Sequence, residues 1–151
     1  MELKAVEIAT YRKPYAWALL LCIISLAGSF ILVKQGYTLL IDETVARIIK
    51  FVFLFGTIGV AALFSSYMKK QKQKIIVLSD LDEKLICYQK VFRSRLWFYF
   101  YCCIGSAFVY YITTSKILFY FGLFDLLLML ITFPNKLILK KELNEEDLII
   151  H

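Results

Sequence analysis

The residue with the clearest chemical potential in this sequence is Asp125, the one charged side chain inside its long apolar stretches. It lies in the middle of the apolar run Ile117–Phe133. A carboxylate at the centre of a bilayer costs ~2.5–3.5 kcal/mol on insertion scales, so its presence requires a reason. Three interpretations follow: a hydrogen-bonding residue that fixes packing, which we favour, a group that handles protons or cations, or a residue that binds a partner within the membrane.

A second set of polar residues follows a helical spacing in the apolar run before it. Tyr99, Cys103, Ser106 and Tyr110 recur at i, i+4, i+7 and i+11, so they share one face of a helix. Ser106 lies at the expected depth of Asp125, and Thr132 shares the face of Asp125. We therefore expect these faces to meet in a candidate intramembrane site made of Asp125, Ser106, Tyr99, Cys103, Tyr110 and Thr132.

The other residues that commonly do chemistry are poorly arranged for it. Cys102 and Cys103 are adjacent in an apolar run, where small packing residues are the better interpretation. The only histidine is His151, and no spacing of His, Cys and carboxylates resembles a metal site. There is no glycine-rich phosphate loop and no nucleophile motif. We therefore predict no catalytic, cofactor-binding or metal-binding residues, and a protein that is not an enzyme.

The elements that position Asp125 are four apolar stretches of 17 to 19 residues: Tyr15–Val33, Phe51–Met68, Leu96–Ile112 and Ile117–Phe133. A helix rises ~1.5 Å per residue, so about 20 residues cross a bilayer core of ~30 Å. Hydrophobic residues form 60% of the chain, well above the ~45–50% of soluble domains. The sequence predicts an all-α polytopic membrane protein, a single four-helix transmembrane domain over residues 1–151 with spans at about 15–33, 45–68, 96–112 and 117–133.

The basic residues set the expected orientation. Fourteen of the eighteen Lys and Arg residues lie in the N-terminal segment, the central loop and the C-terminal segment. The positive-inside rule then places both termini and the central loop in the cytoplasm, with the chain in the plasma (inner) membrane. The net charge of +6 is explained by anionic lipid head groups, and no nucleic-acid partner is expected. Aromatic residues near the span ends are expected to form interfacial belts: Tyr15, Trp17, Tyr67, Trp97, Tyr110, Tyr111 and Tyr120.

The central loop also has a helical pattern. Leu81, Leu85, Tyr88 and Phe92 repeat at i, i+4, i+7 and i+11, and no Gly or Pro interrupts the chain before Leu96. We expect a cytoplasmic helical hairpin over residues 69–95 that extends the second and third membrane helices. Its apolar stripe is the candidate docking surface, aided by a cytoplasmic tail over residues 134–151 in which Asn144 caps a last short helix.

Small residues recur at helical spacing in the first two stretches. Ala18, Cys22, Ser25 and Ser29 form one stripe, and Thr57, Ala61 and Ser65, with Gly56 and Gly59 beside them, form another. In lipid such stripes mark close helix packing, within one chain or between subunits.

The favoured function is a non-enzymatic membrane protein that acts as an accessory, scaffold or protective subunit through its cytoplasmic hairpin and tail. The alternative is a homo-oligomeric channel, or a proton- or cation-linked transporter, that uses Asp125. A lipid-modifying enzyme comes third, because no catalytic set supports it. The expected partners are the lipid bilayer and either further copies of the chain or another membrane protein.

Overall fold

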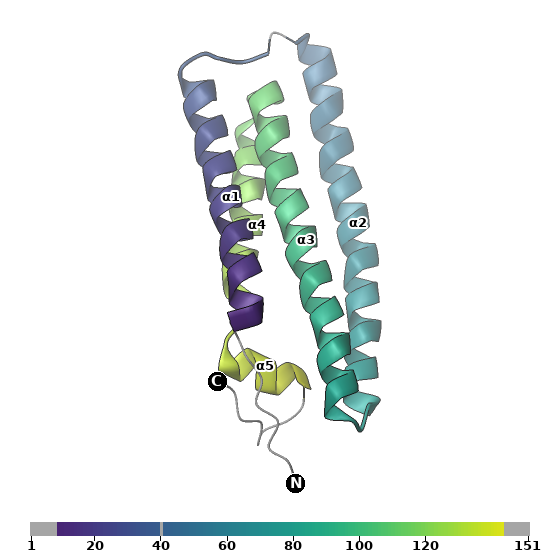
Figure 1. Ribbon diagram of the computed structural model, residues 1–151. Coiled ribbons are helices and arrows are strands. Elements are labelled where there is room, and N and C mark those ends of the chain that lie inside the picture. The colour runs from purple at the N-terminus through teal and green to yellow at the C-terminus, as the bar shows by residue number, and fades with distance from the viewer. Residues whose placement is uncertain (1–8, 40, 144–151) are drawn as a thin grey trace.

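The computed structural model describes residues 9–39 and 41–143 and is all-α, as predicted (Figure 1). Within these ranges the chain forms five helices: α1 (Ala9–Lys34), α2 (Glu43–Val77), α3 (Leu81–Thr113), α4 (Lys116–Ile131) and α5 (Lys136–Leu143). Four of them run roughly along one axis, and the short α5 lies across one end of the group (Figure 1).

Three of the helices, α1, α2 and α3, are long and apolar enough to cross a membrane. Helix α4 has 16 residues, which corresponds to a length of about 24 Å. Alone it is too short to be counted as a span, and α5, which follows it, is bent from it by 80°. The described structure therefore supports three candidate spans by length and composition.

Local sequence signals explain where the helices begin. The Asp42 side chain accepts a hydrogen bond from the backbone N–H of Thr44 at 2.8 Å and caps α2, and Arg47 pairs with Glu43, four residues before it, at 3.3 Å. The Asn135 Oδ1 accepts a hydrogen bond from the Ile138 N–H at 2.7 Å and starts α5. The short helix that the sequence suggested after Asn144 lies outside the described residues.

Helix α1 differs from the expectation. The first apolar stretch begins at Tyr15, but α1 already begins at Ala9, and Pro14 lies inside it. Tyr11, in the added turn, is buried, with 8% of its surface exposed, against Tyr88 and Phe92 of α3. This aromatic packing explains why the helix extends beyond the apolar stretch.

Helix α3 is the centre of the fold. It packs against α1, α2 and α4, whereas α2 packs mainly against α3 and α5. Of the 18 residues in the most apolar stretch of α3, 39% are buried. In the most apolar stretch of the same length in α2, no residue is buried. Helix α2 therefore stands at the side of the group and presents most of its apolar surface outward (Figure 1).

The tightest helix contact is at Gly122 of α4. A Cβ atom at this position would lie 2.7 Å from the Leu26 Cδ2 atom of α1 and 3.2 Å from the Ser106 Cβ atom of α3. Any larger residue would require Leu26 and Ser106 to shift, so glycine favours the close approach of α1, α3 and α4. Gly56 and Gly59 of α2 were expected to mark such a contact, and this expectation is wrong within the chain: a Cβ at either position meets nothing within 4 Å.

Candidate functional site

Asp125 lies on α4 and faces a groove bounded by α2, α3, α4 and α5. The groove has a volume of about 820 Å³, and apolar side chains form most of its wall, among them Ala61, Phe64, Phe98, Phe121, Phe124 and Leu128. Only 6% of the Asp125 surface is exposed. Its Oδ2 atom is buried and has no hydrogen-bond partner among the described residues.

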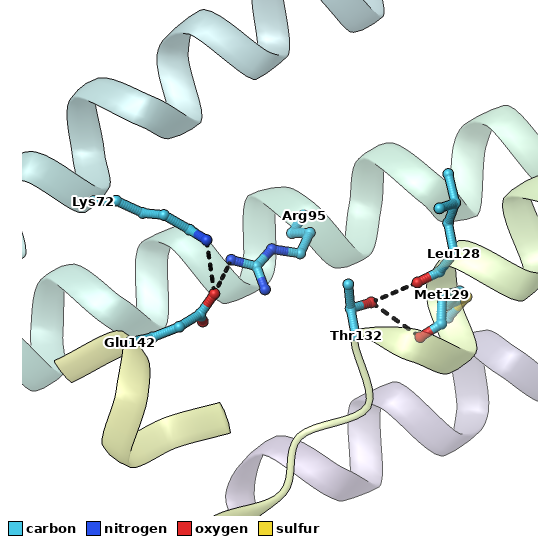
Figure 2. Close-up of polar contacts among 6 residues, drawn as sticks. All are labelled: Lys72, Arg95, Leu128, Met129, Thr132 and Glu142. Carbon is cyan, nitrogen blue, oxygen red and sulfur yellow. Dashed lines mark hydrogen bonds and ion pairs between the residues drawn. The ribbon is translucent and has the colours of Figure 1, made fainter. Parts of the chain in front are cut away.

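Two other residues of the predicted site share this groove with Asp125. Tyr99 of α3 and Thr132, at the end of α4, both line it. The Thr132 hydroxyl donates to the carbonyl oxygens of Leu128 and Met129, at 3.1 and 2.9 Å (Figure 2). These bonds cap the last turn of α4, so Thr132 has a structural use at the groove wall.

Two further predicted residues lie between helices instead. Ser106 is fully buried, and its hydroxyl donates to the Cys102 carbonyl oxygen at 2.7 Å rather than to Asp125. The Cys103 thiol, also fully buried, donates to the Gly122 carbonyl oxygen at 3.7 Å. Both side chains therefore fill the contact between α3 and α4 and do not open into the groove.

Tyr110 is separate from the other members of the predicted site. It is buried and packs against Phe119 at 5.2 Å between ring centroids, in a small cluster with Leu118. Burial also removes Tyr110 from the predicted aromatic belt, and Tyr15 is likewise buried. Trp17, Tyr67, Trp97 and Tyr120 are exposed, as a belt would require.

The groove ends in a cluster of charges that sequence reasoning missed. Lys72 Nζ and a terminal nitrogen of Arg95 both contact the Oε1 atom of Glu142, at 2.9 and 2.8 Å (Figure 2). The side chains of Arg95 and Glu142 are only 11% and 14% exposed. Burial raises the pKa of Glu142, but Arg95 and Lys72 outweigh it and hold this pKa below its usual value. Lys141 lines the same end of the groove.

One signal could have located Glu142. Leu139, Glu142 and Leu143 share a face of α5, and both leucines are buried in the core. An acidic residue that lies between two buried leucines on a short helix must lie against the other helices. Basic residues of α2 and α3 can then pair with it. Arg95 is one of the fourteen basic residues that set the expected orientation, and its contact with Glu142 was not predicted.

The candidate docking surface is largely occupied by the chain itself. Tyr88 and Phe92 are 2% and 5% exposed, and both pack edge-on against Tyr11 at 5.7 and 5.3 Å. Leu81 and Leu85 are partly buried against the same cluster. The stripe therefore joins α3 to α1, and a partner would have to use other residues of this region.

The arrangement offers an apolar trough with cations at one end and a carboxyl group partway along it. In the part of the chain that the structure describes, no three His, Cys, Asp or Glu side chains gather into a metal-binding group. No family model, curated protein or solved structure matches this chain. Its function is therefore argued from its own geometry.

Proposed function

We propose that the chain is a polytopic protein of the plasma (inner) membrane with four spans, the fourth formed by α4 together with Thr132 and Phe133. Both termini and residues 69–95 lie in the cytoplasm. The exposed apolar side chains support this proposal, because Trp17, Leu63 and Ile131 are 68%, 74% and 71% exposed and require lipid around them. The distribution of Lys and Arg supports the orientation.

Within that membrane the protein acts as a non-enzymatic accessory or scaffold subunit. The observation that carries this role is the tip of the hairpin between α2 and α3. Ile76, Val77 and Ile86 are 59%, 84% and 58% exposed there, beyond the lysines that follow the apolar part of α2. Exposed apolar residues that lie past the head-group region mark a protein contact. This tip replaces the buried stripe as the docking surface, and Leu137 of α5, 78% exposed, is an exposed apolar residue of the tail.

The test is the size of the complex extracted from native membranes in mild detergent. Replacing Ile76, Val77 and Ile86 with Gln is expected to release the protein as its smallest unit. Ile76→Val with Ile86→Val is the matched control, because it keeps the tip apolar and is expected to preserve the complex. An unchanged complex in the Gln variant would contradict the accessory role.

A homo-oligomeric channel or a proton- or cation-linked transporter is the second candidate, and one observation favours it. The groove connects the Lys72–Arg95–Glu142 cluster with Asp125, so a polar solute at the charged end has a route to the buried carboxyl group. Asp125→Asn should abolish proton or ion flux in reconstituted vesicles if the protein transports. Unchanged vesicle permeability with and without wild-type protein would reject this function.

A further inference from the structure

The groove beside α2 has the shape of a trough for a chain molecule. Thr57, Ala61 and Ser65 line it on α2, and their short side chains leave room there. The groove extends along α2 from Thr57 past Lys72 to Ile76. The stretch from Thr57 to Lys72 spans fifteen residues, or about 22 Å. One leaflet of a bilayer, head group included, is about 20–22 Å thick, half of the ~40–45 Å total. The distance from Lys72 to the apolar end of the trough therefore matches a lipid in length.

The basic side chains in the groove are gathered toward one end. Lys72, Arg95 and Lys141 line this end together with one carboxylate, Glu142, which leaves a local excess of two positive charges. An arginine has five N–H donors and a lysine three, and the contacts to Glu142 Oε1 use one nitrogen of each. Donors therefore remain for an anion, and phosphate oxygens suit a guanidinium fork beside an ammonium group.

We infer that the groove is a binding site for one anionic phospholipid, with its phosphate at Lys72, Arg95 and Lys141 and an acyl chain along the apolar wall. The position of the cations agrees with this assignment, because in the proposed topology they lie at the depth of the inner head groups. A volume of about 820 Å³ is within the ~300–1,000 Å³ of sites that enclose small molecules. The inference requires membrane insertion but is independent of the accessory role.

Native mass spectrometry of the full-length protein tests the site directly. The protein in mild detergent is offered equal amounts of phosphatidylglycerol and phosphatidylcholine with identical acyl chains. We expect one phosphatidylglycerol to be retained per protomer, in clear preference to phosphatidylcholine. Lys72→Gln with Arg95→Gln should lower this retention about tenfold or more, because two charge-assisted contacts are lost.

Matched variants separate the site from general attraction of lipid to a basic protein. Lys69→Gln with Lys70→Gln removes the same charge from exposed positions nearby and should leave retention unchanged. The Lys72→Gln with Arg95→Gln variant also removes both cations that contact Glu142. Two further variants are therefore independent checks: Lys141→Gln removes a different charge, and Ala61→Trp fills the trough. Both should lower phosphatidylglycerol retention.

Three results would overturn the inference. The first is equal retention of both lipids by the wild type. The second is an equal loss in the Lys69/Lys70 control. The third is a second copy of the chain or a partner helix that is retained in the groove in place of lipid.

Discussion

The glycines of α4 and of α2 are used in opposite ways, although Gly105 of α3 also packs closely against Phe53 of α2. On the side of α3 that faces α1 and α4, Gly122 meets Leu26 and Ser106, and the chain's own helices close the space completely. On the side of α2, Gly56 and Gly59 face open space, and the small stripe lines a groove. The same sequence pattern thus marks an internal contact on one helix and a surface left for something else on another.

The contacts that hold α1 and α4 against α3 differ from those that hold α2 against α3. The closed side, formed by α1 and α4 against α3, contributes Tyr15 and Met129 to the main core, and the Tyr15 hydroxyl donates to the Met129 carbonyl oxygen, whereas α2 contributes only Met68 and Ile75 to this core. The open side depends on fewer contacts, such as the stacking of Phe64 on Phe98 at 4.2 Å and the bridge through Glu142. The comparison predicts that α2 separates more easily than α1 or α4.

The largest expected effect concerns the charged bridge at the end of the open side. Arg95→Leu leaves the buried Glu142 with only the half-exposed Lys72, and removing one partner of a buried pair costs about 3 kcal/mol or more. Thermal unfolding in detergent measures this loss. Lys72→Leu should cost clearly less because Lys72 is 48% exposed, and equal losses would contradict the burial of the Arg95 pair.

The glycines compare the two sides most directly. Gly122→Ala introduces a methyl group where α1 and α3 already meet α4, and overpacking of this kind costs about 1–3 kcal/mol. Gly56→Ala adds the same group in open space and should be neutral or slightly stabilising. Denaturation of the two variants side by side is the measurement. A greater loss for Gly56→Ala would reverse our assignment of the sides.

A smaller effect is expected from the hydrogen bond that ties α1 to α4. Tyr15→Phe removes the hydroxyl group that donates to the Met129 carbonyl, and such bonds in membranes contribute on average about 0.6 kcal/mol. Tyr120→Phe is the control, because Tyr120 is 65% exposed. If both variants unfold alike, the Tyr15 bond does not contribute to closing this side.

The smallest effect is a pH dependence located at Glu142. Its pKa in the folded protein is below its usual value of 4.5, so its ionised form stabilises the fold. This contribution is complete above pH 4.5 and disappears as the pH falls through the lower, folded-state pKa. Glu142→Gln should therefore flatten the decline in stability on the acid side of pH 4.5. An unchanged acid decline would argue against the bridge.

The sequence predicts where the helices lie along the chain better than it predicts which helices pack together. The caps at Asp42 and the ion pair of Glu43 with Arg47 depend on neighbours within one turn, and such local signals are visible in a sequence. The start of α1 was misplaced because Tyr11 is held by Tyr88 and Phe92, far along the chain. Contacts of that kind have no local signature.

The candidate site was predictable only in part for the same reason. Asp125 was identifiable from its cost in an apolar stretch, and the structure places it with Tyr99 and Thr132 at one groove. Helical spacing correctly placed Ser106 and Cys103 on one face of α3. It could not show that these two side chains pack between α3 and α4 and do not line the groove. The bridge through Glu142 required the bend between α4 and α5, which a linear pattern does not contain.

The most direct test of the account is the membrane orientation of the two ends of α2. A variant without native cysteines carries a single cysteine at Gln35, before α2, or at Ser79, after it. A membrane-impermeant maleimide is added to intact cells and to permeabilised cells. The account predicts that the Gln35 position is labelled in intact cells and that the Ser79 position is labelled only after permeabilisation. Labelling of the Ser79 position in intact cells would contradict it.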